Sequence, residues 1–163
     1  MTIKTGVLTI SDKGFEGKRK DESGPAVAEM LTKAGYIVEK QGIVPDNFEK
    51  IVECLIKWVD VENLSLIVTT GGTGVSPTDI TPEAMLEVIK YQIPGMAEAM
   101  RAASLTKTPH AMLSRGIVGV RGKSLIINLP GSPDGAKENL AVILPAINHG
   151  LAKISGDMND CTK

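Results

Sequence analysis

Apolar segments alternate with amphipathic ones along the chain. Five short segments are rich in Ile, Val and Leu and lack the spacing of a helix, which predicts strands. These predicted strands are Gly6–Ile10, Tyr36–Val44, Leu64–Val68, Ile117–Val120 and Leu125–Leu129. The last two flank Arg121-Gly122-Lys123, which predicts a hairpin or tight turn.

Between these strands, apolar residues recur every three or four positions and predict helices. The predicted helices start at Ser23-Gly24-Pro25, at Pro45-Asp46, at Thr81-Pro82, after Pro94-Gly95 and near Leu140. The first is expected to end at Gly35, and the last to bend at Pro145. Asp46 with Glu49 fits a capping box, and Thr81 is expected to cap the helix that it opens.

Strands that alternate with helices are typical of an α/β fold with a mostly parallel sheet and helices on both faces. The length of 163 residues suits a single domain, residues 1–163, and no repeat or linker divides it. The polar tail, residues 155–163, is expected to fray. In such a sheet the carboxyl ends of the parallel strands lie at one edge, where ligands bind.

Composition and charge narrow the classes of function. The chain is 42% hydrophobic and 23% charged, as soluble globular proteins are. Its net charge of −1 lacks the basic excess typical of a protein that binds duplex nucleic acid. No apolar run is long enough for a membrane helix, and no signal peptide is visible. Two cysteines, Cys54 and Cys161, make no disulfide framework, so a cytoplasmic protein is expected.

Four loops that follow predicted strands carry the candidate chemistry. They contain Ser11-Asp12, Pro45-Asp46, Gly71-Gly72-Thr73-Gly74 with Asp79, and Pro130-Gly131-Ser132. If the strands are parallel, these loops converge. Glycines permit positive φ, and successive N–H groups in such a turn bind anions such as phosphate. A carboxylate beside a phosphate needs a cation, so Asp79 is expected to hold Mg²⁺, with Asp46 and Asp12 as weaker candidates.

Each of these residues also has a plainer interpretation. The glycines could form only a tight turn between a strand and a helix. Asp46 could only cap its helix, and the spacing of Ser132 between two prolines favours a turn residue. If Thr81 caps the following helix, Asp79 has no such role, which makes it the carboxylate with the best support for a function.

Other motifs fail on spacing. Gly116 to Ser124 resembles a Walker loop, but it has five residues between its glycines where the motif needs four, and a strand follows. Pro77 stands where the dinucleotide fingerprint requires its third glycine. His110 and His149 have no partners at the spacing of a zinc site, and no nucleophile elbow is present.

Several motifs follow one another between Lys4 and Ile154. They are Thr69-Thr70-Gly71-Gly72-Thr73-Gly74, Asp79–Ala84, Pro94-Gly95-Met96 with Met100-Arg101, Leu113-Ser114-Arg115 and Asn128–Pro133. In combination they resemble the MogA/MoaB family of molybdenum cofactor biosynthesis, which is related to the G domain of gephyrin. The resemblance implies a molybdopterin-binding α/β fold and a homotrimer.

The resemblance also implies an activity and a site. MogA-type members transfer AMP from Mg-ATP to the terminal phosphate of molybdopterin and release pyrophosphate. Asp79 and Asp46 match carboxylates needed for catalysis or metal binding, Gly71–Gly74 match a nucleotide and phosphate loop, and Ser132 matches a pterin-site serine. Together with the converging loops, this gives the predicted binding residues Ser11, Asp12, Gly71, Gly72, Thr73, Gly74, Arg101, Ser114, Arg115, Pro130, Gly131 and Ser132.

One position departs from the family pattern. Many members have Arg directly before the motif aspartate, where this chain has Thr78, so one positive charge near the phosphates is missing. MoaB-type members imply an alternative, a protein that binds and delivers molybdopterin without adenylylating it. The form Asp79-Ile80-Thr81-Pro82-Glu83 is closer to the active type and favours the adenylyltransferase. A scaffold that acts through its trimer surface is less favoured, because the sequence shows no long linker.

Overall fold

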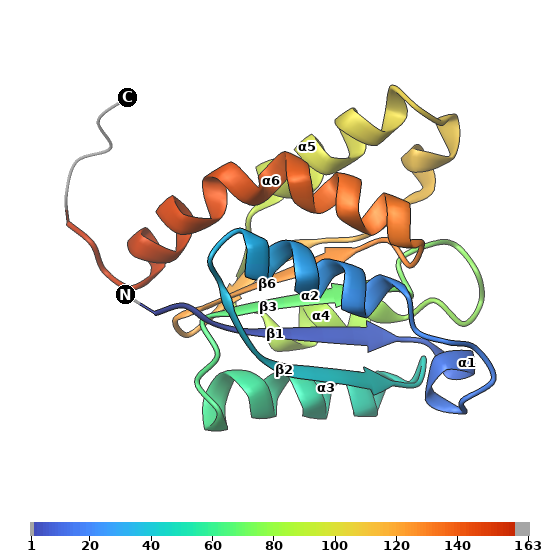
Figure 1. Ribbon diagram of the computed structural model, residues 1–163, viewed down its shortest axis with the longest axis horizontal. Coiled ribbons are helices and arrows are strands. Elements are labelled where there is room, and N and C mark those ends of the chain that lie inside the picture. Colours follow the sequence, from blue (N-terminus) through green and yellow to red (C-terminus); the bar gives the residue numbers. More distant parts are fainter. Residues whose placement is uncertain (1, 159–163) are drawn as a thin grey trace.

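The computed structural model describes residues 2–158, and its centre is a six-stranded sheet in the order β2-β1-β3-β6-β5-β4 (Figure 1). The strands are β1 (Lys4–Ile10), β2 (Ile37–Val44), β3 (Leu66–Thr70), β4 (Tyr91–Gln92), β5 (Val118–Arg121) and β6 (Ser124–Leu129). Strands β2, β1, β3 and β6 are parallel, whereas β5 and β4 pair antiparallel. The prediction of a mostly parallel sheet, with a hairpin between its last two long strands, is confirmed.

Helices cover both faces of the sheet, as predicted (Figure 1). The helices are α1 (Asp12–Phe15), α2 (Ser23–Lys33), α3 (Phe48–Ile56), α4 (Thr81–Val88), α5 (Pro94–Leu105) and α6 (Pro133–Ile154). A π-helical turn, η1 (Lys57–Val61), extends α3, and a 3₁₀ turn, η2 (Pro109–Leu113), follows α5. Within residues 2–158, no helix is both long enough and apolar enough to span a bilayer.

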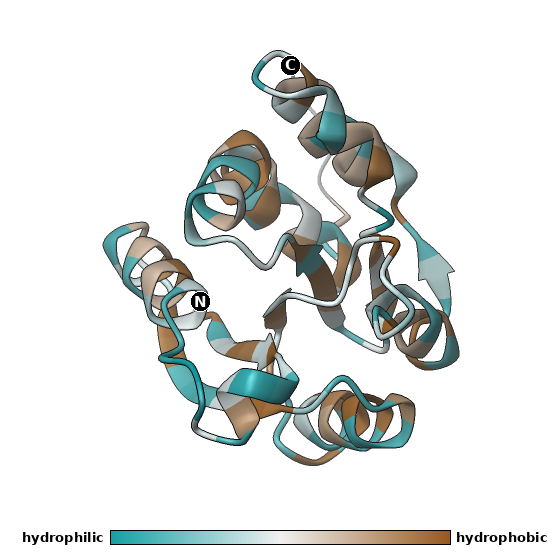
Figure 2. Cartoon of the chain, turned by 90° about the vertical axis from the view of Figure 1, so that its right-hand side faces the viewer, coloured by the Kyte–Doolittle hydropathy of each residue, from teal (hydrophilic) through white to brown (hydrophobic). Residues whose placement is uncertain are grey.

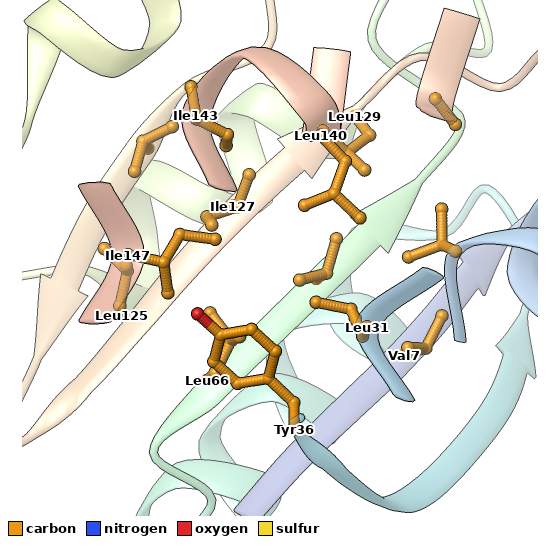
Figure 3. Packing of buried hydrophobic residues seen from close by; sticks show 14 of the residues in the cluster. Val7, Leu31, Tyr36, Leu66, Leu125, Ile127, Leu129, Leu140, Ile143 and Ile147 are labelled. Carbon is orange, nitrogen blue, oxygen red and sulfur yellow. The ribbon is translucent and has the colours of Figure 1, made fainter. Parts of the chain in front are cut away.

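Strands β1, β3 and β6 are mostly apolar, and each contributes residues to two cores. Leu66 and Val68 of β3 face α2, α5 and α6, whereas Ile67 between them faces α3 and α4. Figure 3 shows the first core, in which Leu31 of α2 and Leu140 of α6 lie over the strands. A strand buried on both faces is mostly apolar, which is the pattern that predicted it. The buried polar side chains of Thr69 and Asn128 are satisfied by a hydrogen bond between them.

Some local predictions were wrong. The N-cap of α3 is Asn47, whose side chain accepts from the Lys50 N–H, so Asp46 and Glu49 form no capping box. Thr81 lies inside α4 as its first residue, and its hydroxyl donates to the Gly71 carbonyl oxygen (2.9 Å) instead of capping the helix. The side chains of Asp46 and Thr81 instead form hydrogen bonds with the loops at the carboxyl edge of the sheet.

Other elements had no clear pattern in the sequence. Helix α1 is a single turn and β4 has two residues. The π-helical turn η1 directly follows α3 and carries on its apolar face. In the predicted frayed tail, the N–H groups of residues 155–157 still donate to the last turn of α6. Residues 159–163, which include Cys161, lie outside the described part of the chain.

The strand order places a topological switch point between β1 and β3. The chain leaves β1 toward β2 on one side and returns to β3 on the other. The loops that follow these strands therefore diverge and leave a crevice at the carboxyl edge, which is the usual ligand site of such sheets.

Candidate functional site

The four predicted loops meet at the carboxyl edge of the sheet. Figure 2 views the molecule from the side toward which β1, β2 and β3 point. Two cavities open there, of about 540 and 570 Å³, which is the size range of small-molecule sites. The expectation that distant loops share one rim is therefore supported by the geometry.

The first cavity, called here the α5 cavity, lies against α5, η2 and the start of α6. Its wall includes Arg101, Lys107, His110, Ser114 and Asn139. The second, the α2 cavity, lies between the loops after β1 and β2 and the start of α2. Its wall includes Ser11, Arg19, Lys20, Ser23 and Asp46.

The two cavities share a rim. Gly72, Asp79, Gly131 and Ser132 line both of them. Gly131 packs closely on the segment Gly71–Gly74, called the glycine loop below. A Cβ at position 131 would lie 3.3 Å from the Gly71 Cα atom. A group bound at the rim is therefore accessible from either side.

The glycine loop has a backbone that only glycine adopts readily. Gly71 has a φ of +96° and Gly72 a φ of +66°. Within residues 2–158, the N–H groups of Gly72, Thr73 and Gly74 donate to no protein acceptor. Three successive free N–H groups next to a cavity form a concave site for an anion, as expected for phosphate.

Helix α6 begins at the rim, with Asp134 in its first turn. Ser132 is its N-cap, and its hydroxyl accepts from the Gly135 N–H (3.2 Å). This role differs from the turn residue that spacing alone favoured. The N-terminal end of a 22-residue helix carries partial positive charge, which favours an anion at the rim.

Three carboxylates gather beside these donors. Asp12 and Asp46 exchange hydrogen bonds, since each backbone N–H donates to the other's carboxylate (3.0 and 2.9 Å). Burial raises the pKa of Asp46 above its ordinary value, and the negative charges of Asp12 and Asp79 raise it further. Asp79 accepts from the Ser76 N–H (3.0 Å) and reaches the shared rim.

This set of donors fits a magnesium ion better than a softer metal. Mg²⁺ takes oxygen ligands, often one or two carboxylates together with substrate phosphates. Within residues 2–158, no cluster of three or more His, Cys, Asp or Glu side chains could hold a metal by itself. Asp46 and Asp79 could thus hold Mg²⁺ only jointly with a phosphate ligand.

The structure brings together most of the residues predicted for the site. Those that line a cavity are Ser11, Asp46, Gly71, Gly72, Thr73, Gly74, Asp79, Arg101, Ser114, Pro130, Gly131 and Ser132. Asp12 and Arg115 line neither cavity. Asp12 holds Asp46 through the paired hydrogen bonds, and Arg115 donates to carbonyl groups of the glycine loop.

Sequence reasoning missed several residues of the cavity walls. Arg19 and Lys20 lie in the α2 cavity, and Lys107 and Asn139 lie in the α5 cavity. The basic run from Lys18 to Lys20 is a visible signal in the sequence. Lys107 and Asn139 had no recognisable pattern around them.

Comparisons with known proteins show similarity over most of the chain. The family described as a probable molybdopterin binding domain matches residues 6–149. A molybdopterin adenylyltransferase of Helicobacter pylori strain J99 is 43% identical over 160 residues, covering 96% of this chain and 90% of that protein. Gephyrin of Dictyostelium discoideum is 40% identical over 92% of this chain, which spans only 22% of gephyrin's length.

A solved structure has the same fold. The molybdopterin biosynthesis enzyme MoaB of Thermus thermophilus superposes with a TM-score of 0.90 and 47% identity. The superposition covers 96% of this chain and 98% of that one.

Proposed function

The chain belongs to the molybdopterin-binding domain family, and on this premise we propose that it adenylylates molybdopterin in molybdenum cofactor biosynthesis. An oxygen of the molybdopterin phosphate attacks the α-phosphorus of ATP. The bond between the α-phosphorus and its bridging oxygen breaks, and pyrophosphate leaves with that oxygen. Adenylyl-molybdopterin and pyrophosphate are the products.

The shared rim is the observation that supports this proposal. Two substrates that react through their phosphates need two cavities that meet at one anion site. Gly72, Asp79, Gly131 and Ser132 line both cavities, and the free N–H groups from Gly72 to Gly74 lie next to this rim. Holding two reactants in line at a common point contributes much of the rate enhancement in such reactions.

The protein groups at the rim have distinct roles in this proposal. The loop N–H groups and the start of α6 bind phosphate oxygens and stabilise negative charge that develops on them. Asp79 and Asp46 would hold Mg²⁺, which offsets phosphate charge when it is bound. The attacking phosphate is ionised at neutral pH, so the site needs no general base.

The adenylyl-transfer assay tests the proposal directly. We expect protein, molybdopterin and Mg-ATP to yield pyrophosphate and adenylylated pterin. Asp79→Asn should lower turnover about 100-fold, because it removes the charge at the rim and leaves the shape of the side chain. Melting temperature and circular dichroism check that the variant is folded.

The matched control is Glu87→Gln, the same change of carboxylate to amide on the exposed side of α4. It should leave turnover unchanged. Wild-type turnover in Asp79→Asn would remove Asp79 from the mechanism. Binding of molybdopterin without any product would instead identify the protein as a delivery module of the MoaB type.

Two further features remain proposals. The homotrimer implied by the resemblance is expected in sedimentation equilibrium, and a monomer at micromolar concentration would contradict it. A cytoplasmic location is proposed from cysteine usage and is tested by fractionation of the source cell.

A further inference from the structure

Arg115 lies beside the site but outside both cavities. Its neighbour Ser114 lines the α5 cavity, whereas Arg115 lines neither. The Arg115 side chain is 36% exposed, so it is only partly removed from water. This position is unexpected for a residue predicted to bind substrate, and it raises the question of what the guanidinium group contacts.

The contacts of Arg115 are carbonyl oxygens of the glycine loop and its continuation. Nε donates to the Gly74 oxygen (2.7 Å), and a terminal nitrogen donates to the Asp79 oxygen (3.0 Å). The Arg115 backbone N–H donates to the Thr73 oxygen (2.7 Å). One residue therefore ties both ends of the segment from Gly74 to Asp79 to the body of the protein.

Little else holds this segment. Val75 to Thr78 are exposed. Within residues 2–158, the other hydrogen bonds of segment 74–79 are all internal: Asp79 N–H to the Ser76 oxygen, Ser76 N–H to the Asp79 carboxylate, and one between the Ser76 and Thr78 hydroxyls. Thr81, just beyond the segment, donates from its N–H and its hydroxyl to the Gly72 and Gly71 oxygens, so Arg115 supplies the outside hydrogen bonds to the segment itself.

Glu83, on the first turn of α4, fixes the orientation of the guanidinium group. It forms an ion pair with the remaining terminal nitrogen of Arg115. The hydrogen bond from Arg115 lowers the pKa of Glu83, so the pair stays charged at neutral pH. Arginine suits this role because its planar fork directs several N–H donors at once, which a lysine ammonium group does not do.

We propose that Arg115 is a positioning residue, which, held by Glu83, keeps the segment from Gly74 to Asp79 in the conformation that presents Asp79 to the shared rim. The inference rests on the proposed adenylyl transfer at that rim. Arg115 touches no substrate in this role, and it acts through the backbone of the loop.

Turnover is the first readout. Arg115→Ala should lower kcat about 100-fold, with a smaller change in the KM values, because small displacements of a reacting constellation have effects of this size. Arg115→Lys should recover only part of the loss. Added guanidinium ion, below unfolding concentrations, should restore turnover in Arg115→Ala and not in Asp79→Asn.

Hydrogen exchange of the free protein is the second readout. The amides of Ser76 and Asp79 should exchange at least about 10-fold faster in Arg115→Ala, since the segment opens more often. The control is Arg121→Ala, which removes a comparable arginine bound to the Asp60 carboxylate and the Val88 carbonyl oxygen, away from the cavities. It should leave both exchange of the segment and turnover per folded protein unchanged.

Three results would overturn the positioning role. These are wild-type turnover in Arg115→Ala whatever its exchange rate, lost turnover with unchanged exchange, and full recovery of turnover in Arg115→Lys. If the wild type makes no adenylylated pterin, the proposed function fails separately. Hydrogen exchange of the segment then carries the test, and equal exchange of the Ser76 and Asp79 amides in wild type and Arg115→Ala would overturn the inference.

Discussion

The two cavities differ in how their basic side chains are used. In the α5 cavity, Lys107 forms an ion pair with Glu138 (2.6 Å), and Arg101 donates to the Ser114 and Gly116 carbonyl oxygens. In the α2 cavity, Arg19 and Lys20 have no side-chain partner among residues 2–158. Lys107 is thus paired with a carboxylate, whereas Arg101 keeps its charge because its carbonyl partners are neutral. Arg19 and Lys20 form no ion pair within the described residues, although the wall of their cavity also contains Asp21, Glu22 and Asp46.

We propose that this difference separates the two substrates between the cavities. A triphosphate carries more negative charge than a terminal phosphate, and unpaired cations stabilise it most. We therefore assign the ATP phosphates to the α2 cavity and the pterin to the α5 cavity. The assignment depends on the proposed function, and the predictions below test it.

The largest effect is expected where the cavities meet. Gly72→Ala adds a Cβ that would lie 2.2 Å from the Thr81 hydroxyl, on a backbone with φ of +66°. We expect a loss of about 1–3 kcal/mol in the free energy of unfolding. Turnover should fall about 100-fold, with weaker binding of both substrates, because the shared rim is displaced.

Urea unfolding and steady-state kinetics measure these effects. The control is Gly150→Ala in α6, where an added Cβ meets no atom within 4 Å. Because alanine favours a helix over glycine, this change should be neutral or stabilise by up to about 1 kcal/mol. A Gly72→Ala variant that weakens only one substrate would contradict the common rim.

A smaller effect on KM should show which cavity binds Mg-ATP. The double change Arg19→Ala and Lys20→Ala should raise the KM for Mg-ATP about 10-fold, with little change for molybdopterin. The salt dependence of the KM for Mg-ATP should also weaken, since screened surface charges are lost.

Lys107→Ala is the matched change in the α5 cavity, where it removes the partner of Glu138. It should leave the KM for Mg-ATP within about twofold of wild type, because this charge is already paired. If Lys107→Ala raises that KM and the double change does not, the two substrates occupy the opposite cavities.

The smallest effect concerns stability. The folded protein raises the pKa of Asp46, so it binds that proton more tightly than the unfolded chain does. The free energy of unfolding therefore falls as the pH rises from the ordinary value of 3.8 through the raised pKa. Asp46→Asn removes this fall and should melt at or above the wild-type temperature at pH 7, while turnover drops.

Melting curves between pH 3.5 and pH 7 test whether Asp46 lowers the free energy of unfolding as the pH rises. Asp60→Asn is the contrasting variant, because the hydrogen bond from Arg121 lowers the pKa of Asp60. It should melt below wild type at pH 7, with a difference that shrinks in acid. A lower melting temperature for Asp46→Asn at pH 7 would show that its carboxylate stabilises the fold.

The fold could be predicted from the sequence largely because it depends on local patterns. The apolar run at Ile67 and Val68 identified β3, since a strand buried on both faces is mostly apolar. The glycines after β3 indicated an unusual turn. By contrast, β4 has two residues and is defined by its pairing with β5, which no local pattern reports.

The site was predictable as a set of loops but not as a set of contacts. The spacing of Asp46 and Glu49 predicts a helix cap, yet the Asp46 carboxylate accepts from the Asp12 N–H, 34 residues earlier in the chain. Arg115 reaches Gly74 across 41 residues. Contacts of this range depend on the assembled sheet, and spacing rules describe only neighbours along the chain.

The shared rim has a consequence for how such a protein diversifies over evolution. Since Gly72, Asp79, Gly131 and Ser132 belong to both cavities, a mutation at any of them alters the handling of two molecules at once. Mutations in the outer walls, at Arg19 or Lys107, alter one molecule only. Descendants with new substrate preferences should therefore vary at those walls and inherit the rim unchanged.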